Sequence, residues 1–205
     1  MMKKFVFVLV IILSFLTSSK LIAQEQDEYD EIILDNKIYK PGSNWVSLGT
    51  GLSYNFDSEE IEKNINVSYH QRIKEHYFNV GYHAASKESF IYLSSQKLND
   101  LYFGYGWRRE KQKTQQSLFI GASYSWGGIF HHNETGWLDT VTTYNIPVYR
   151  YFTEPGIYID YSLLYKFYYD VGLGTDFYIS ANRYYQVAGI RLCIYFSGAY
   201  KGKID

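Results

Sequence analysis

The stretch Trp45–Phe56, with the sequence WVSLGTGLSYNF, decides the fold. From Val46 onward its even-numbered positions read Val, Leu, Thr, Leu, Tyr and Phe, and the odd-numbered positions between them read Ser, Gly, Gly, Ser and Asn. Successive side chains of a β-strand point to opposite faces, so this period of two predicts a strand with one bulky, mostly apolar face and one small, polar face. A tilted strand of about ten residues is long enough to cross the hydrocarbon layer of a membrane.

The same alternation recurs in seven further segments, and their second faces lack the dense charge expected on the exposed face of a soluble β-sandwich. Those faces are rich in Gly, Ser and Asn, which suit the crowded lumen of a narrow barrel, whereas the bulky faces suit lipid. We therefore predict an all-β fold, an antiparallel up-and-down transmembrane β-barrel of eight strands, in preference to a soluble sandwich or a lipocalin-like barrel. The seven segments are Asn64–His70, Phe78–His83, Asp100–Arg108, Ser117–Trp126, Ile157–Lys166, Val171–Ser180 and Ala188–Ser197.

The connections between these segments fit a barrel with short periplasmic turns and longer outer loops. Two outer connections leave the strand number open, because Ser89–Leu93 and Thr142–Phe152 could each form another strand and give ten. The longest connection could instead hold a hairpin that stands above the membrane. The predicted turns are Ile73–His76, Glu110–Gln116 and Phe167–Asp170, and the predicted outer loops are Asp57–Lys63, Ala85–Asn99, Gly128–Pro155 and Ala181–Tyr185.

The N-terminal residues predict export. Lys3 and Lys4 precede the apolar run Phe5–Leu16, which is too short for a membrane-spanning helix, and small and polar residues follow up to Ala23. This is the layout of a secretory signal peptide cleaved after Ala23, and an uncleaved N-terminal anchor is the alternative. We therefore divide the chain into a signal peptide (1–23), an acidic periplasmic lead segment (24–43), an outer-membrane β-barrel (44–197) and a C-terminal tail (198–205).

The lead segment has two interpretations. It opens with five acidic residues between Glu25 and Glu31, which favours a solvated segment. In the alternative, Ile32–Leu34 and Ile38–Tyr39 form a docking strand or a partial plug.

Composition excludes several classes of protein. The whole chain has a formal net charge of −1, and the mature chain is more acidic because Lys3, Lys4 and Lys20 leave with the signal peptide. An acidic balance argues against a nucleic-acid partner. Cys193 is the one cysteine, so no disulfide can form within the chain. A mean hydropathy of −0.27 argues against a bundle of membrane helices.

Aromatic residues make up 20% of the chain and include 23 Tyr. Tyr and Trp gather at membrane interfaces, where one end of the ring is apolar and the other is wet. We therefore predict an outward-facing aromatic belt formed by Trp45, Tyr54, Tyr69, Trp107, Tyr124, Trp126, Tyr161, Tyr165 and Phe196.

The inward faces carry a few charges of both signs, which predicts a charge network that closes the lumen. An unpaired charge in a narrow interior is costly, so each should find a partner. The seventh and eighth strands are neighbours, and Asp176–Arg191 is therefore the expected direct pair. The network consists of Arg108, Asp160, Lys166, Asp176 and Arg191.

No catalytic, cofactor-binding or metal site is predicted. The best cluster of reactive side chains is His131, His132, Glu134 and Asp139, but it lacks a metal-ligand spacing and is interpreted as solvated loop residues. His70 and His83 are expected to be hydrogen-bonded fillers of the lumen. The sequence GLGTD at 172–176 is no phosphate loop, because no helix follows it.

The ending LIAQ (21–24) of the signal peptide and the strands GLGTDFYISAN (172–182) and VAGIRLCIYFSGAY (187–200) resemble small outer-membrane β-barrel proteins of the Bacteroidota. These belong to the architectural class of OmpA-, OmpX- and OmpW-like barrels. The resemblance implies a place in the bacterial outer membrane, with membrane lipid, lipopolysaccharide and the barrel assembly machinery as partners. One departure is that Phe196 ends the last strand while Ser197–Asp205 continues, whereas many such barrels end on a terminal aromatic residue.

Two classes of function agree with these observations. The first is a non-enzymatic barrel with a structural or surface-interaction role, which we prefer because an eight-stranded lumen is just wide enough for side chains to fill. The second is transport of small hydrophobic compounds or passive diffusion, which needs an open lumen or a lateral opening. An outer-membrane enzyme is the least favoured reading, because no nucleophile stands beside an oriented base.

Overall fold

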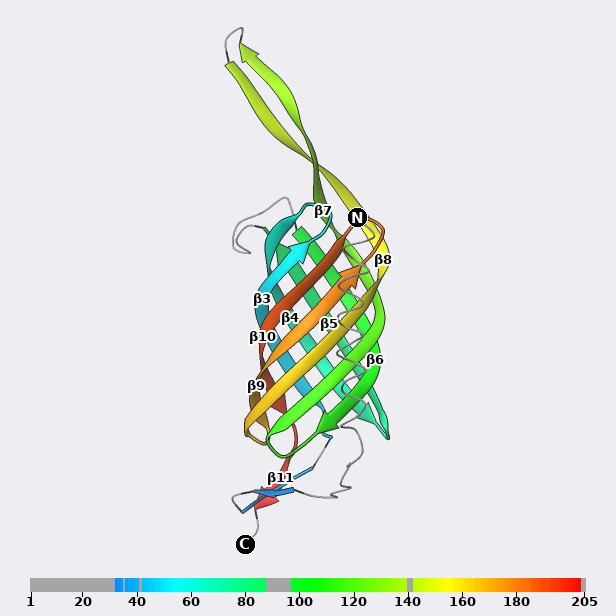
Figure 1. The fold of residues 1–205 in the computed structure, drawn as a ribbon, viewed down its shortest axis with the longest axis vertical. Coiled ribbons are helices and arrows are strands. Elements are labelled where there is room, and N and C mark those ends of the chain that lie inside the picture. Colours follow the sequence, from blue (N-terminus) through cyan, green and yellow to red (C-terminus); the bar gives the residue numbers. More distant parts are fainter. Residues whose placement is uncertain (1–31, 35, 41, 88–96, 140–141, 204–205) are drawn as a thin grey trace. The chain divides into compact units, whose positions relative to one another are not determined.

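The computed structural model describes residues 32–34, 36–40, 42–87, 97–139 and 142–203, and the side chains of 97 and 129–149 lie outside the description (Figure 1). The described residues form the strands β1 to β11. Among them there is no helix long and apolar enough to span a membrane.

Eight strands close into one antiparallel barrel, in which each strand pairs with the next along the chain and β10 pairs with β3 (Figure 1). The predicted eight-stranded up-and-down barrel is confirmed. The strands are β3 (Trp45–Asn55), β4 (Glu60–Ile73), β5 (His76–Ser86), β6 (Lys97–Glu110), β7 (Thr114–Asp139), β8 (Thr142–Tyr168), β9 (Val171–Ala181) and β10 (Gln186–Ser197).

The alternation of bulky and small residues in the sequence matches the alternation of exposed and buried residues in the barrel wall. In β3 the residues at even positions are exposed, and the residues at odd positions are buried or half-buried in the lumen. β4 follows the same rule from Glu62 to His70, where each buried residue is polar. The outer face is therefore a continuous apolar surface, built from residues such as Leu52, Phe103, Ile120 and Leu192.

The third outer connection is almost entirely strand. β7 and β8 pair from Thr114↔Tyr165 to Asp139↔Thr142, so they continue past the rim of the barrel as a hairpin (Figure 1). Thr142–Phe152 is the first part of β8 and adds no strand to the barrel, so the ten-strand alternative is wrong for this segment. The other candidate, Ser89–Leu93, lies in a range that the structure leaves undescribed.

Pro147 and Pro155 lie within the β8 ladder, opposite Asn133 and Tyr124, although the sequence places them in a loop. The pairing of β8 with β9 begins at Ile157↔Ala181, so both prolines lie where β8 is an edge strand. An edge strand tolerates proline because the missing N–H can face away from the ladder.

A second, three-stranded sheet joins the two ends of the described chain. β1 (Ile32–Leu34), β2 (Lys37–Tyr39) and β11 (Tyr200–Lys203) pair in the order β1-β2-β11. The Lys40 N–H donates to the carbonyl of Ala199 at 2.8 Å. The described half of the lead segment thus forms strands instead of a plain solvated lead, because apolar Ile32, Leu34 and Tyr39 pack against Tyr169 and Ala199.

This small sheet lies at the end of the barrel where β3 begins and β10 ends, which is also the end of the short turns (Figure 1). The Ser197 N–H donates to the Asp170 carbonyl at 2.8 Å, and the Gly198 N–H donates to the Asn44 carbonyl at 3.1 Å. The rings of Tyr39 and Tyr169 lie 5.1 Å apart. We call this end of the barrel the turn end and the opposite end the hairpin end.

Candidate functional site

The lumen is the part of the barrel in which the predicted polar residues meet. All five residues of the predicted charge network point inward and are buried, with no more than 3% of any residue exposed. They form two groups along the barrel, one around Arg191 and one around Arg108 near the turn end. These residues are Arg108, Asp160, Lys166, Asp176 and Arg191.

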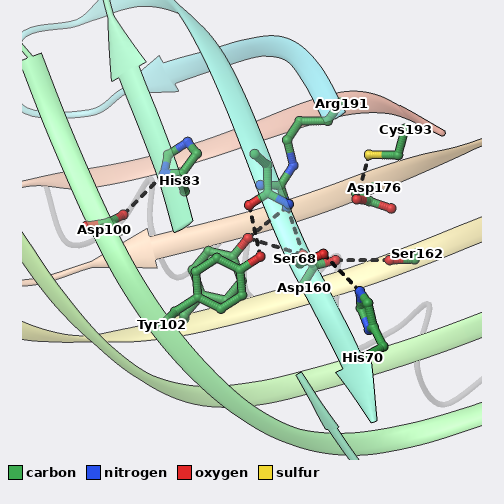
Figure 2. Close-up of polar contacts among 12 residues, drawn as sticks. Ser68, His70, His83, Asp100, Tyr102, Asp160, Ser162, Asp176, Arg191 and Cys193 are labelled. Carbon is green, nitrogen blue, oxygen red and sulfur yellow. Dashed lines mark hydrogen bonds and ion pairs between the residues drawn. The ribbon is translucent and has the colours of Figure 1, made fainter. Parts of the chain in front are cut away.

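Arg191 is the centre of the first group (Figure 2). Its Nη2 donates to the Asp160 carboxylate and to the Tyr158 hydroxyl, each at 2.7 Å. Its guanidinium lies 4.2 Å from the centre of the Tyr178 ring. The predicted ion pair with Asp176 is wrong, although Arg191 and Asp176 are partners in the β9–β10 register.

Asp176 has other partners on β10, as Figure 2 shows for Cys193. The Cys193 thiol donates to its carboxylate at 2.7 Å, and the Tyr195 hydroxyl donates to its second oxygen. Asp160 accepts in addition from Ser162 and Tyr158, both at 3.1 Å. Charge-assisted hydrogen bonds of this kind offset the loss of hydration of both carboxylates.

A stacked pair of tyrosines fills the lumen beside this group. The rings of Tyr102 on β6 and Tyr158 on β8 lie 3.8 Å apart and are within 10° of parallel. The Tyr102 hydroxyl also donates to Asn66 on β4 at 2.9 Å. Gly81 on β5 makes room for this ring, because a Cβ there would lie 2.5 Å from Tyr102 Cζ. The sequence analysis did not single out either tyrosine. The signal was present, because the predicted outward aromatic residues of β6 and β8 stand at odd positions, whereas Tyr102 and Tyr158 stand at even positions and therefore face the lumen.

The two predicted filler histidines are buried in the lumen and bonded (Figure 2). His83 Nδ1 lies 3.2 Å from the Asp100 carboxylate, and its ring packs 4.7 Å from that of Tyr178. His70 Nε2 lies 3.0 Å from Ser68 Oγ. Both residues fill space between strands, in agreement with the prediction.

Tyr185 closes the lumen toward the hairpin end. Its hydroxyl donates to the Glu62 carboxylate, which also accepts from Asn55 at 3.0 Å. Burial and the neighbouring Glu62 carboxylate raise the pKa of the Tyr185 hydroxyl, so this hydroxyl keeps its proton for the bond. Asn182 fixes the loop, because its side-chain oxygen accepts from the backbone N–H groups of Tyr184 and Tyr185.

Glu110 closes the lumen at the turn end. Its carboxylate pairs with Lys166 and accepts from the Tyr169 hydroxyl at 2.8 Å and from the Gly42 N–H at 2.8 Å. Arg108 donates to the Ser43 carbonyl at 3.0 Å. The segment between the small sheet and β3 is therefore held to the turn end of the lumen through Gly42 and Ser43.

Trp45 does not belong to the outer aromatic belt, so that prediction is wrong. It is 4% exposed and packs inside the barrel, with its ring 5.3 Å from that of Tyr195 and 4.5 Å from the Arg108 guanidinium. Trp45 stands at an odd position of β3, and odd positions of this strand face the lumen. The position in the strand therefore sets the direction of the side chain, whatever the residue type. The other predicted belt residues point outward with their rings exposed or half-exposed: Tyr54, Tyr69, Trp107, Tyr124, Trp126, Tyr161, Tyr165 and Phe196.

Two arginines converge on one ring at the hairpin end. The guanidinium of Arg150 on β8 lies 4.8 Å from the centre of the Tyr184 ring, and that of Arg183 lies 5.5 Å from it. Both arginines are exposed. Neither has an ion pair with a carboxylate of the described residues. The Arg150 Nη2 also donates to the Tyr184 hydroxyl at 3.4 Å. We call Arg150, Arg183 and Tyr184 the outer rim cluster, which brings two planar cationic groups to the Tyr184 ring.

No group of His, Cys, Asp and Glu that could hold a metal ion occurs among the described residues. The backbone of His131, His132, Glu134 and Asp139 lies in the β7–β8 hairpin, and their side chains are outside the description.

The fold and the lumen together define a class: a small antiparallel barrel of eight strands with an apolar outer face and an interior filled by polar and aromatic side chains. The chain is similar to Neisserial surface protein A, with 11% identity and a TM-score of 0.53 over 75% of this chain and 95% of that one. An identity this low shows a shared fold and no shared activity. No protein-family model and no curated protein sequence matches the chain.

Two further solved barrels have lower TM-scores. The attachment invasion locus protein Ail of Yersinia pestis has 8% identity and a TM-score of 0.48 over 77% of this chain and 95% of that one. The N-terminal β-barrel domain of OprF from Pseudomonas aeruginosa has 11% identity and a TM-score of 0.45 over 75% of this chain and 98% of that one.

Proposed function

We propose that the protein is a non-enzymatic barrel of the outer membrane, of the small Bacteroidota type, with a structural or surface-interaction role. The signal peptide 1–23 would direct export and be removed, and the barrel assembly machinery would insert the mature chain. The exposed apolar side chains all around the barrel support this location, because a protein surrounded by water rarely exposes an apolar surface of such extent.

The observation that carries the choice of role is the filled lumen. Arg191 and its partners occupy the middle of the barrel, the bonds of Tyr185 cross the hairpin end, and the bonds of Glu110 cross the turn end. An eight-stranded barrel has no spare width once side chains of this size point inward. Transport through the lumen would require these bonded groups to separate, so the role falls to the outer surfaces.

The outer rim cluster supplies a surface for contact with lipopolysaccharide. A guanidinium binds a phosphate oxygen pair through two parallel N–H donors, and Arg150 and Arg183 offer two such groups around the Tyr184 ring. With the termini in the periplasm, this cluster faces the outer leaflet, where lipopolysaccharide phosphates are abundant. The β7–β8 hairpin would stand beside it as the most exposed part of the protein.

Cell fractionation and planar-bilayer recording test the proposal. The protein should stay in the outer-membrane fraction after carbonate extraction and should migrate faster on gels when it is not heated. The purified protein should show little ion conductance in planar bilayers. Recovery as a free periplasmic protein would refute the location, and a steady open pore would favour transport.

Accessibility tags test the orientation. A tag inserted between Asp139 and Thr142, where β7 ends and β8 begins, should bind antibody on intact cells, because a connection between strands tolerates an insertion that the paired positions of the ladder do not. A tag at Gln112–Lys113, in the β6–β7 turn, should bind antibody only after the cells are opened. The reverse result would invert the barrel.

A further inference from the structure

Basic side chains gather at the turn end of the barrel. At the turn end, the β4–β5 and β6–β7 connections carry the exposed residues Lys74, Lys111 and Lys113, and the half-buried Arg109 is the last residue but one of β6. We call these four residues the basic turn patch. The hairpin end carries charges of both signs at its surface, with Asp57, Glu59 and Glu60 in and just after the β3–β4 connection and with the exposed cations Lys63, Arg150 and Arg183.

The described carboxylates leave the basic turn patch unpaired. None of its four residues forms an ion pair within the described part of the chain. Glu110 stands between Arg109 and Lys111 in the sequence, but its carboxylate is turned inward and bonded to Lys166, Tyr169 and Gly42. Since the wall places successive residues on opposite faces, the cations beside Glu110 stay on the outside.

The patch lies where the apolar outer face ends. Lys74 follows Ile73, whose side chain is half exposed. The Lys113 carbonyl accepts from the Lys166 N–H at 2.8 Å, which brings Lys113 beside the exposed rings of Phe167 and Tyr168. Apolar side chains bordered by long cationic ones are typical of a membrane interface, because lysine can bury its stem and keep its ammonium at headgroup level.

We propose that the basic turn patch binds the phosphate groups of anionic phospholipids in the inner leaflet of the outer membrane. This inference rests on the location and orientation proposed above, which place the turn end at that leaflet. The cations then lie at the depth of the lipid phosphates, and each adds to the attraction of an anionic headgroup. The patch would give the barrel a preferred shell of anionic lipid and hold it at a fixed depth.

Spin-labelled lipids measure this preference directly. The protein purified from membranes is reconstituted in phosphatidylcholine with a trace of spin-labelled phosphatidylglycerol or spin-labelled phosphatidylcholine. The immobilised fraction of each label then gives a relative association constant. We expect a several-fold preference for phosphatidylglycerol that shrinks as NaCl is raised, because salt screens exposed charges.

Neutral and charge-conserving variants assign the preference to the patch. The combined change Lys74→Gln, Arg109→Gln, Lys111→Gln and Lys113→Gln should bring the ratio close to one, whereas Lys74→Arg, Lys111→Arg and Lys113→Arg together should keep it. As a matched pair of single changes, Lys113→Gln should lower the ratio and Lys63→Gln, an exposed position near the hairpin end, should not. A preference that survives the combined neutral change would overturn the proposal.

Two other outcomes would also overturn it. If the preference appears only after Glu25, Asp27, Glu28, Asp30 and Glu31 are neutralised, the acidic lead of the chain itself covers the patch. If the combined neutral change leaves the lipid ratio intact but abolishes binding to isolated peptidoglycan, the partner is the cell wall. In each case cell fractionation reports separately whether the outer-membrane proposal stands.

Discussion

Arg191 of β10 forms its ion pair with Asp160 of β8, two strands away, with 2.7 Å between Nη2 and Oδ2. The residue opposite Arg191 in the β9–β10 ladder is Asp176, with which Arg191 forms no ion pair. The pair is fully enclosed by the barrel wall. Losing either charge therefore leaves the other buried and unpaired.

Replacement of Arg191 tests the strength of this pair. Arg191→Met should lower the free energy of unfolding by about 3–5 kcal/mol, because Asp160 and the Tyr158 hydroxyl lose their cationic partner in a buried site. Urea unfolding from lipid vesicles, followed by tryptophan fluorescence, measures the change.

A double-mutant cycle then identifies the partner. Arg191→Met and Asp160→Asn should cost less together than the sum of their single effects, because both remove one interaction. The coupling of Arg191→Met with Asp176→Asn should be smaller, since Asp176 is bonded to Cys193 and Tyr195. A larger coupling with Asp176 would contradict the assignment.

Gly81→Ala should destabilise the barrel by about 1–3 kcal/mol through overpacking. The added Cβ would lie 2.5 Å from Tyr102 Cζ and 2.7 Å from the Val67 carbonyl, and stacking on Tyr158 prevents the Tyr102 ring from moving away. Gly198→Ala is the matched control, because a Cβ there meets nothing within 4 Å and should change stability little. Equal midpoints for the two variants in the same urea titration would show that the lumen is looser than described.

Glu110→Gln should destabilise the turn end. Lys166 and Arg108 would keep their charges in a buried site without a carboxylate, which typically costs about 3–5 kcal/mol. Glu75 is exposed in the β4–β5 turn, so Glu75→Gln should cost less than about 0.5 kcal/mol. Thermal unfolding of the reconstituted variants compares the two. Indistinguishable unfolding curves would show that Glu110 does not stabilise the turn end.

Tryptophan quenching by brominated lipids tests the placement of Trp45. Trp107 is 40% exposed on the outer face and should be quenched strongly in vesicles of brominated lipid. Trp45 is 4% exposed inside the barrel and should be quenched weakly. Trp45→Phe should therefore leave the quenched fraction of the emission unchanged or higher, whereas Trp107→Phe should lower it. The opposite order would return Trp45 to the lipid-facing belt.

The wall of the barrel was predictable from the amino-acid sequence alone. Side chains of a strand alternate between its two faces. Once one residue of Trp45–Phe56 is known to face outward, the alternation therefore predicts which other residues of this strand face outward. The neighbouring strands show the same alternation. The inward direction of Arg108, Asp160 and Arg191 follows from that local rule, whereas the choice between eight and ten strands required the pairing of β7 with β8. Where residue type was given more weight than phase, as for the belt assignment of Trp45, the prediction was wrong.

The pairing of the inward side chains depends on tertiary contacts that the alternation does not encode. Arg191 is long enough to reach past its register neighbour Asp176, and the curvature of the closed wall brings Asp160 and Tyr158 within 2.7 Å of its Nη2. The small sheet is decided in the same way, because β2 and β11 are separated by the whole barrel in sequence and meet only once the barrel closes. A local period carries no information about contacts set by closure, because these depend on the register and curvature of all eight strands together.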